Sequence, residues 1–283
     1  MNNISLILIF LLFNLILFLS KQKLSNLVNV YDLPEKRKIH KVKTPLIGGY
    51  LLILNLILFS FLIIFNFYSF EFIAHIFISK LNFYLFIMSL FIIFCIGAVD
   101  DKINLNPNLK LLLLTILLSC VLYLDNTLLI ENLRFSFLEN NISLGKYSFV
   151  FTILCFLLFI NACNMFDGIN LQSGSYFLIF ILFISLVGQP SFFSIILISS
   201  LLNFLLLNKN GKIFMGDSGI YLYAFTLGFI AIKSYNANII GDVDTIFILM
   251  MVPGIDMLRM FITRIINRKN PFRLSVSTYA FFY

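Results

Sequence analysis

Charged residues are scarce in this sequence, which excludes a soluble chain with a wetted surface. Only 12% of the 283 residues are charged, 60% are hydrophobic, and the mean hydropathy is +1.00. Apolar runs long enough to cross a bilayer core, roughly 20 residues each, recur along the whole chain. Such a composition is typical of an integral membrane protein, in which lipid replaces water around the apolar surface.

Cysteine is also sparse, and its spacing excludes a disulfide scaffold and a zinc site. The four cysteines lie in or at the end of apolar runs, without CxxC spacing or clustered histidines. The net charge of +7 comes from basic residues in short loops between apolar runs, which favours a role in membrane orientation over nucleic-acid binding. No internal repeat or soluble domain is found, so residues 1–283 are expected to form a single integral membrane domain.

Nine apolar runs predict an all-α polytopic membrane protein with nine transmembrane helices, and a tenth span could begin at Thr278. The sixth and seventh runs are expected to form a tight helical hairpin. The polar segment after the fourth run alternates and turns like a small extracytoplasmic β-hairpin. The nine runs cover residues 4–20, 46–68, 81–99, 109–124, 148–163, 175–187, 191–207, 219–232 and 245–262.

Alternating these nine spans divides the 20 basic residues unequally between the two sides of the membrane. Four fall on the side of the N-terminus, namely Lys80, Arg134, Lys146 and Lys233. The other 16 face the opposite side, which the positive-inside rule makes the cytoplasm, so the N-terminus is expected outside. These 16 are Lys21, Lys23, Lys36, Arg37, Lys38, Lys41, Lys43, Lys102, Lys110, Lys209, Lys212, Arg259, Arg264, Arg268, Lys269 and Arg273.

Two adjacent carboxylates, Asp100 and Asp101, follow the third run at its cytoplasmic end. Their joint ionisation calls for a cation, a lysine or a shared proton. A pair of aspartates after a helix is also a common solvated stop signal, because acidic groups are costly inside lipid. For this pair alone, the two interpretations carry equal weight.

A second polar stretch follows the fifth run, between Asn161 and Gly168. If the helix continues through this stretch, Asn161, Asn164 and Asp167 fall at i, i+3 and i+6 along one face. Three polar side chains on one stripe at a lipid boundary indicate a surface that faces a ligand. The alternative is helix capping by Asn and Asp before the glycine.

A third stretch leads into the eighth run, where Asp217 lies beside Gly216 and Gly219. Glycines let the backbone approach a phosphate closely while a helix N-terminus faces it. Asp217 is also a suitable helix N-cap. Capping alone leaves the flanking glycines unexplained, which favours a functional role.

Alternation of the spans places Asp100, Asp101, Asn164, Asp167 and Asp217 on the same face as the basic loop 21–45. The basic residues of that loop can bind anionic headgroups without any catalytic role. Carboxylate and amide oxygens, however, suit Mg²⁺ or Mn²⁺, and basic side chains suit phosphates. Together these groups predict phosphoryl transfer at a membrane surface, with a metal ion neutralising charge on a diphosphate leaving group.

Four ordered motifs resemble those of the polyprenyl-phosphate N-acetylhexosamine-1-phosphate transferases, which form glycosyltransferase family 4. That family includes the phospho-N-acetylmuramoyl-pentapeptide transferase of peptidoglycan synthesis and the enzymes that start O-antigen and teichoic acid linkage units. The likeness covers the chain to about Phe272. The four motifs are Asp32 to Gly49, Asp100-Asp101, Asn161 to Gly168, and Phe214 to Asp217.

The resemblance implies a role for each matched residue. Asp217 with Asn164 resembles the family's Mg²⁺ site. Asp100 and Asp101 resemble its acidic pair, one of which is the base that readies the lipid phosphate, and the sequence leaves the choice between them open. The residues that the resemblance implies in substrate binding are Lys110 at a phosphate, Asp167 and Asn170 near the nucleoside, Phe214 at the uracil, and His40 in the basic loop.

The implied reaction transfers an N-acetylhexosamine-1-phosphate group from a UDP-sugar to undecaprenyl phosphate and releases UMP. The resemblance places this reaction at the cytoplasmic face of a bacterial plasma membrane, with grooves between spans holding the lipid tail. The expected partners are the two substrates and membrane lipid, without nucleic acid. The hexosamine, the polymer pathway and the formation of a homodimer are left open.

The C-terminal segment departs from the family pattern. Bacterial members follow the region of Asn270-Pro271-Phe272 with a His-rich loop and further spans, whereas this chain continues for 11 residues from Arg273 to Tyr283. This difference predicts a C-terminus that is truncated or altered by a frameshift, and a natural divergent short form is the alternative. Two alternatives to an active transferase stay open. One is a catalytically inactive homologue. The other is a membrane transporter or flippase, which is expected to place polar groups near the bilayer midplane.

Overall fold

The computed structural model describes residues 3–34, 41–65, 67, 76–77, 79–187 and 192–268. Within these residues, nine α-helices coincide with the nine predicted apolar runs, and a further helix, α2, lies where the apolar pattern predicts none. The ten helices are α1 (Asn3–Leu19), α2 (Lys21–Val28), α3 (Gly48–Ile64), α4 (Lys80–Ile103), α5 (Pro107–Leu124), α6 (Ser148–Phe166), α7 (Gln172–Val187), α8 (Phe192–Asn208), α9 (Gly216–Asn236) and α10 (Val243–Ile266).

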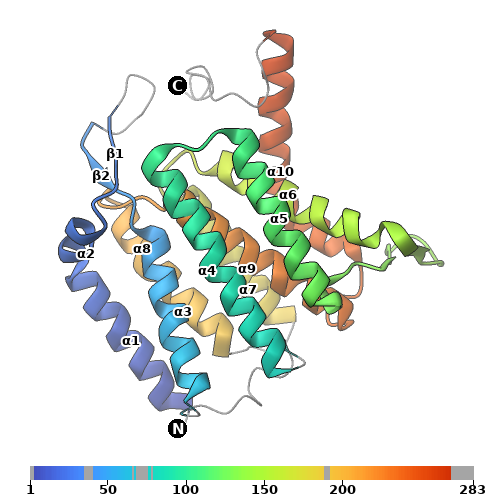
Figure 1. The fold of residues 1–283 in the computed structure, drawn as a ribbon, viewed down its shortest axis with the longest axis horizontal. Helices are drawn as coiled ribbons and strands as arrows, with labels where there is room; N and C mark the ends of the chain where they lie inside the picture. The colour runs from blue at the N-terminus through green and yellow to red at the C-terminus, as the bar shows by residue number, and fades with distance from the viewer. Residues whose placement is uncertain are drawn as a thin grey trace.

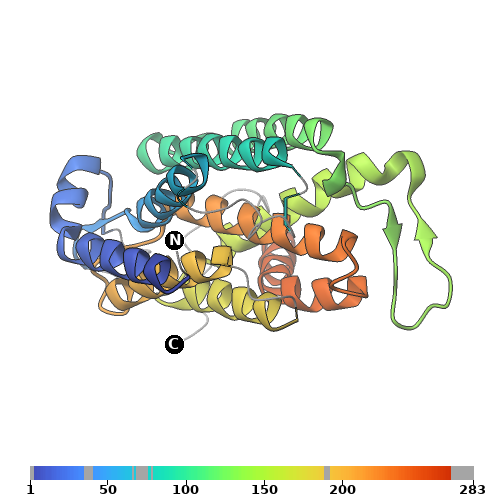
Figure 2. The same ribbon diagram turned by 90° about the horizontal axis from the view of Figure 1, so that it is seen from below.

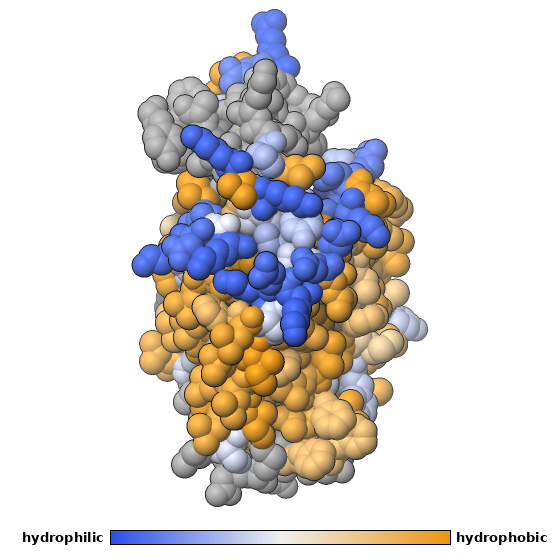
Figure 3. Space-filling view, turned by 90° about the vertical axis from the view of Figure 1, so that its left-hand side faces the viewer, coloured by the Kyte–Doolittle hydropathy of each residue, from blue (hydrophilic) through white to orange (hydrophobic). Residues whose placement is uncertain are grey.

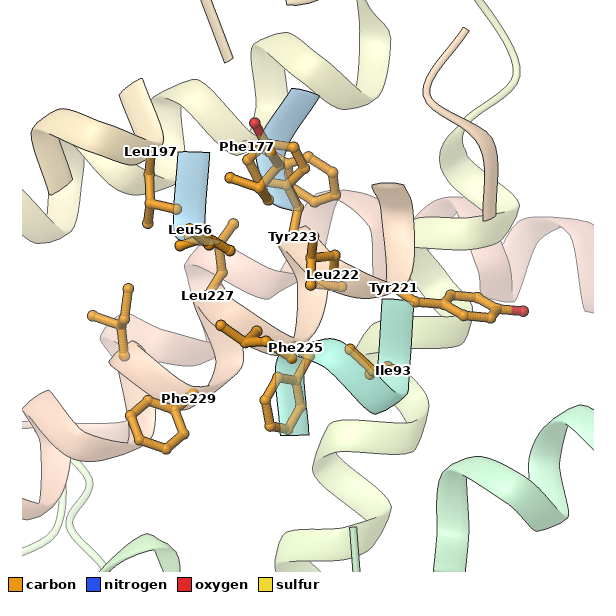
Figure 4. Close-up of a cluster of buried hydrophobic side chains, with 14 of the residues drawn as sticks. Leu56, Ile93, Phe177, Leu197, Tyr221, Leu222, Tyr223, Phe225, Leu227 and Phe229 are labelled. Atoms are coloured by element: carbon orange, nitrogen blue, oxygen red, sulfur yellow. The ribbon is translucent and has the colours of Figure 1, made fainter. Parts of the chain in front are cut away.

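Helix α9 lies at the centre of the bundle and is buried on all its faces (Figures 1 and 4). Every residue from Ser218 to Tyr235 is buried, as expected of a helix that is apolar all round. Helices α3, α4, α6 and α7 pack around it. Aromatic rings fill the space between α9 and α4, where the centroids of Phe86 and Phe229 are 4.3 Å apart. The start of α9, which carries Asp217, is therefore held among other helices at one end of the bundle.

The surface of the bundle is apolar over most of its height. Along α1, the side chains of Leu8, Leu12 and Ile16 follow one another at a spacing of four residues and are all exposed. Figure 3 shows an apolar body below a band of hydrophilic residues at the end where α2 and the first hairpin lie. An exposed surface of this kind suits a lipid environment.

Four helices, α4, α5, α6 and α10, are long and apolar enough to cross a membrane. Helices α1 and α2, which meet at an angle of 67°, provide a fifth span if they are counted together, and α3, α7 and α8 are shorter apolar helices. The structure thus shows an all-helical membrane protein. The count of nine spans stays a prediction.

Two short antiparallel hairpins complete the fold. Strand β1 (Tyr31–Asp32) pairs with β2 (Thr44–Pro45) inside the basic loop, and β3 (Asn132–Leu133) pairs with β4 (Ile142–Ser143). The second pair confirms the hairpin predicted after the fourth run, and Figure 2 shows it projecting beyond the bundle. Single 3₁₀ turns, η2 (Asn126–Leu128) and η3 (Gly145–Tyr147), flank this second hairpin.

The turn between α4 and α5 is shorter than the sequence predicts. Helix α4 continues to Ile103, and Asn104 ends it in the left-handed region with a φ of 50°. The side chain of Asn106 then accepts a hydrogen bond from the Asn108 backbone nitrogen and caps α5, with Pro107 at its first position. Asp100 and Asp101 therefore belong to the last turns of α4, and α5 starts directly beside them.

Some predictions concern residues outside the described ranges. These are His40, the connection at 188–191 between the two helices of the predicted hairpin, and the C-terminal segment at 269–283, which includes Thr278. Helices α7 and α8 themselves pack against each other, as the predicted hairpin requires.

Candidate active site

Glycine residues allow three helices to meet at the start of α9. A Cβ atom at Gly97 of α4 would lie 2.4 Å from the Cα of Ser218, and one at Gly49 of α3 would lie 2.5 Å from the backbone nitrogen of Gly219. Both distances are too short for any side chain. The end of α4 and the start of α3 can therefore approach the backbone around Asp217 directly, and this contact sets the position of the site.

Asp101 caps helix α9 from the neighbouring helix. Its Oδ1 accepts a hydrogen bond from the backbone nitrogen of Asp217 at 2.7 Å, and its Oδ2 accepts one from that of Ser218 at 3.1 Å. The first N–H groups of a helix have no partner within the helix, and a carboxylate there is also favoured by the helix dipole. The sequence allowed Asp217 itself to be the N-cap of this helix. In the structure the capping carboxylate belongs to Asp101.

The glycine before Asp217 is explained by the same contact. Gly216 has a φ of +74°, and a Cβ atom there would lie 2.7 Å from Oδ2 of Asp101. Only glycine adopts this conformation without strain and also leaves room for the carboxylate. A direct contact between this backbone and a phosphate stays a prediction.

Asp100 is buried and hydrogen-bonded at both oxygens. Only 1% of the residue is exposed. Its Oδ1 accepts a hydrogen bond from the Leu105 backbone nitrogen at 2.9 Å, and its Oδ2 accepts one from the Tyr221 hydroxyl at 3.1 Å. The ammonium group of Lys110 also forms an ion pair with Oδ2 of Asp100. Such partners offset the cost of burying a charged group at the edge of an apolar bundle.

Lys110 joins Asp100 to Asp217. Its Nζ pairs with Asp100 and lies 3.4 Å from Oδ2 of Asp217. The side chains of Lys110 and Asp217 are partly open to solvent, with 20% and 28% exposed, whereas that of Asp100 is inaccessible. A substrate would therefore meet Lys110 and Asp217 first, with Asp100 behind them.

The cluster of Asp100, Asp101, Lys110 and Asp217 contains three carboxylates and one ammonium group, which pairs with Asp100 and Asp217. Such an excess of negative charge favours a bound cation, or a proton held between carboxylates. The donors are oxygens, which is the chemistry that Mg²⁺ prefers. Among the described residues, however, no group of three or more acidic, histidine or cysteine side chains has the geometry of a formed metal site.

The predicted stripe on α6 is only partly formed. Asn161 and Asn164 lie half-buried in the last turns of α6, but Asp167 is its C-cap residue, outside the helix. No hydrogen bond joins Asn164 to the cluster around Asp217 within the part of the chain that the structure describes. Burial raises the pKa of the Asp167 carboxyl to about 6, although the Ser173 hydroxyl donates a hydrogen bond to it.

The loops that carry Asn170 and Phe214 are tied together by a buried asparagine. The side chain of Asn208 accepts a hydrogen bond from the Leu171 backbone nitrogen at 2.6 Å and donates one to the Ile213 carbonyl at 2.9 Å. Asn170 is exposed, and Phe214 is half-buried. The structure therefore brings the two loops side by side, at the same end of the bundle as Asp217.

The backbone of Phe214 is fixed further by the first hairpin. Its nitrogen donates a hydrogen bond to the Pro45 carbonyl at 3.0 Å, and its carbonyl accepts one from the Gly48 nitrogen at 3.0 Å. The basic loop, which ends at β2, is thereby attached to the segment that leads into α9. This contact links the first of the four sequence motifs to the last.

Sequence reasoning missed Tyr221, Asn208 and Gly97 as parts of the site. Tyr221 and Asn208 lie inside or at the end of apolar runs, where they resemble ordinary core residues. The spacing of four residues between Asp217 and Tyr221, which puts both on one face of α9, is the one sequence signal for Tyr221. Gly97 is visible in the sequence only as a glycine near the end of an apolar run.

The fold and the site together define a polytopic helical membrane protein with a carboxylate and lysine site at one end of its bundle. Residues 83–235, more than half of the chain, match the sequence model of Glycosyl transferase family 4. The chain belongs to this family. The matched segment runs from α4 to α9 and contains every predicted site residue except His40.

Three relatives show how far the similarity extends. The chain is 27% identical over 280 residues to a protein of Escherichia coli and 28% identical over 280 residues to one of Yersinia pestis, in both cases covering 94% of this chain and 72% of the relative. It is 28% identical over 265 residues to a protein of Haemophilus influenzae, covering 88% and 70%. All three are named undecaprenyl-phosphate alpha-N-acetylglucosaminyl 1-phosphate transferase. These findings confirm the family resemblance drawn from the four motifs.

Proposed function

We propose that this protein transfers an N-acetylhexosamine-1-phosphate group from a UDP-sugar to undecaprenyl phosphate and releases UMP. The observation that carries the proposal is the linkage of Asp100, Lys110 and Asp217 at one end of an apolar helical bundle. Family membership supports it, and the names of the matched relatives make UDP-N-acetylglucosamine the first donor to test.

The reaction exchanges one phosphorus–oxygen bond for another. An oxygen of the lipid phosphate forms a bond to the phosphorus that carries the sugar. The bond from this phosphorus to the bridging oxygen breaks, and UMP leaves with the electron pair. Chemistry of this kind depends mainly on positioning and on neutralising charge, which is what a carboxylate and lysine cluster at a membrane edge can supply.

The partly exposed ammonium group of Lys110 would contact a substrate phosphate. One of the two adjacent aspartates, Asp100 or Asp101, would accept the proton of the lipid phosphate where that group is protonated. Both oxygens of each aspartate already accept hydrogen bonds. A carboxylate has about four lone-pair positions, so either aspartate can still accept a proton while these bonds stay in place. The choice between the two aspartates stays open.

A divalent metal ion belongs to the proposal as well. Asp217 and Asn164 would hold Mg²⁺ or Mn²⁺, and the excess of carboxylates in the cluster supports a cation there. When bound, the ion neutralises negative charge on the diphosphate. Asp167, Asn170, Phe214 and His40 are proposed to bind the nucleotide part of the donor.

The site is proposed to lie on the cytoplasmic side of a bacterial plasma membrane. The N-terminus is proposed to lie outside, and the chain is proposed to cross the membrane nine times. The unequal distribution of lysine and arginine supports this orientation. Labelling of single cysteines from each side of the membrane, in a variant without the native cysteines, tests it. A cysteine at Asn106 should react only from inside and one at Asn140 only from outside, and the opposite result would overturn the orientation.

The transporter alternative has little support from the interior of the bundle. A buried amide cluster joins α1, α3 and α8, where Asn14 and Asn55 exchange hydrogen bonds of 2.9 and 3.1 Å and Asn203 donates one to the Asn14 carbonyl at 3.0 Å. These contacts join helices to each other. The described charged cluster, by contrast, lies at helix ends.

Membranes that contain the protein provide the direct test. They should transfer radiolabelled N-acetylglucosamine phosphate from UDP-N-acetylglucosamine to added undecaprenyl phosphate when Mg²⁺ is present. Asp217→Asn should lower this rate on the order of 100-fold, since it weakens the binding of the Mg²⁺ ion that would neutralise charge on the diphosphate. Asp242→Asn, at the N-cap position of α10, is the matched control remote from the site. An Asp217→Asn variant with full activity would remove the proposed role of Asp217.

A further inference from the structure

Tyr221 carries a buried hydroxyl group near the start of α9. The residue is 1% exposed and lies on α9, the helix buried on all faces. A hydroxyl group without a partner is costly in such surroundings. The chain contains 35 phenylalanines against 12 tyrosines, so phenylalanine is its common choice for a buried aromatic position. The hydroxyl of Tyr221 therefore calls for an explanation beyond the filling of space.

The explanation lies in the direction of the ring. Figure 4 shows Tyr221 pointing away from the apolar cluster around α9, with its oxygen at the far end. That oxygen donates a hydrogen bond to Oδ2 of Asp100 at 3.1 Å. Tyr223, two residues further along the same helix, lies on another face, where its hydroxyl is 2.9 Å from that of Ser200.

Three donors from different parts of the fold meet at the Asp100 carboxylate. Tyr221 comes from α9, Lys110 from α5, and the Leu105 nitrogen from the turn between α4 and α5. Tyr221 and Lys110 share one oxygen, Oδ2. The tyrosine hydroxyl thus fixes the direction of the oxygen that holds the lysine ammonium group.

The position of Lys110 relative to Asp217 depends on this arrangement. Tyr221 follows Asp217 by one helical turn, so both lie on the same face of a single rigid helix. Asp217 lies 3.4 Å from the Lys110 ammonium group on one side, and Tyr221 reaches the same ammonium group through Asp100 on the other. Helix α9 therefore sets both contacts that hold Lys110 in place.

We propose that Tyr221 is a positioning residue that orients Asp100 and thereby places the Lys110 ammonium group for contact with a substrate phosphate. This role rests on the proposed transferase function, because the phosphate is that of its substrates. Without the hydroxyl, the carboxylate of Asp100 can turn away from α9, and Lys110 moves with it.

The test compares two variants that each remove one buried hydroxyl from α9. Tyr221→Phe should lower kcat about tenfold, because small displacements of a charged group near the reacting phosphates are costly. The KM for each substrate should stay within about twofold, because the groups that touch substrate remain. Tyr223→Phe, the matched control, should leave kcat unchanged. Thermal unfolding in detergent should give similar midpoints for both variants.

A double-mutant cycle shows whether Tyr221 acts through Asp100. In an Asp100→Asn background, Tyr221→Phe should cause no further loss of kcat, because the orientation of the carboxylate no longer matters. A Tyr221→Phe variant with the kcat of wild type, or an equal loss in both backgrounds, would overturn the inference. Wild-type membranes without transfer would instead overturn the proposed function, and with it the catalytic meaning of Tyr221.

Discussion

The Asp101 carboxylate on α4 caps the helix that carries Asp217, with its Oδ1 2.7 Å from the Asp217 backbone nitrogen. Two acidic residues far apart in the sequence are thus held together by a backbone contact, which satisfies the free N–H groups of a buried helix end. Asp101 therefore has a structural task that its neighbour Asp100 does not share. Asp100 and Asp101 are adjacent in the sequence but have different surroundings and different hydrogen-bond partners.

Replacing Asp101 should disturb both stability and activity. Asp101→Ala removes the cap of α9 and should lower the free energy of unfolding by about 1–2 kcal/mol, the usual effect of losing a helix cap. It should also lower the transfer rate, because Asp217 loses its anchor. Asp101→Asn keeps one oxygen acceptor and should be closer to wild type in stability. Thermal unfolding in detergent and transfer assays on the same preparations measure both effects.

The control for this prediction is Asp242, the N-cap residue of α10, whose side chain makes no capping hydrogen bond. Asp242→Ala should change neither quantity appreciably. Equal losses from Asp101→Ala and Asp242→Ala would contradict the capping role of Asp101.

A methyl group at Gly216 should damage the same contact. Gly216→Ala forces a side chain into a backbone with positive φ, which costs roughly 1–2 kcal/mol, and pushes it against Asp101. Gly254→Ala in α10 is the matched control, since nothing lies within 4 Å of a Cβ atom there. That change should be neutral or stabilise by up to about 1 kcal/mol, as alanine is the better helix former. Thermal unfolding midpoints of the two variants and the wild type measure these effects. A Gly216→Ala variant with the midpoint of the wild type would contradict the described contact between Gly216 and Asp101.

The end of α9 remote from the site is held by a buried ion pair between Lys233 and Asp125. Lys233 Nζ is 2.9 Å from Oδ2 of Asp125, and the two side chains are 8% and 3% exposed. Lys233→Met should leave the Asp125 charge buried without its partner and should cost about 3–5 kcal/mol. The double variant with Asp125→Asn should recover most of this loss. If the single and double variants unfold alike, the loss does not come from an unpaired buried charge at Asp125.

Stability should also fall in acid because of Asp125. Burial raises the pKa of its carboxyl, but hydrogen bonds from Thr127 and Lys233 outweigh burial and hold the pKa below the usual value. A carboxyl of this kind stabilises the fold at pH values above its unfolded pKa of about 4, and the effect disappears as the pH falls through the lower folded value. The free energy of unfolding of the wild type should therefore decrease as the pH falls below about 4. The double variant Lys233→Met/Asp125→Asn should lack this part of the decrease.

The raised pKa of the Asp167 carboxyl predicts that binding of the UDP-sugar depends on pH. Its pKa of about 6, raised by burial, means that the carboxyl is mostly neutral below this pH and ionised above it. An ionised carboxylate accepts hydrogen bonds from a nucleoside more strongly, so the KM for the UDP-sugar should fall as the pH rises through 6. Asp167→Asn should give a KM that no longer changes across this range. A wild-type KM that is constant from pH 5 to 7.5 would contradict the proposed position of Asp167 near the nucleoside.

The helices were predictable because lipid demands long apolar runs, and each predicted run contains a helix. The end of α4 was not, since Asp100 and Asp101 interrupt the apolar pattern at Val99, while the helix continues to Ile103. The charged residues stay helical because other elements satisfy their side chains. Short polar elements such as α2 and the first hairpin leave no periodic signal over their few residues.

The site was predictable as a list of residues on one face but not as a set of contacts. Alternation of spans places Asp100 and Asp217 at the same end. Their linkage through Lys110 depends on the three-residue turn between α4 and α5, and on glycines that let α4 touch α9. Tyr221 could not be recognised because its role depends on which way its ring points, and periodicity does not give that direction.

In the proposed reaction, a sugar and its phosphate move together onto the lipid. The measurement that distinguishes this reaction from transfer of the sugar alone uses UDP-N-acetylglucosamine labelled in the phosphate next to the sugar, with undecaprenyl phosphate as acceptor and purified protein in detergent with Mg²⁺. The label should enter the lipid fraction in equal amount with the sugar while unlabelled UMP is released. Release of the label as soluble UDP, or transfer of sugar without it, would show that the phosphate does not move with the sugar.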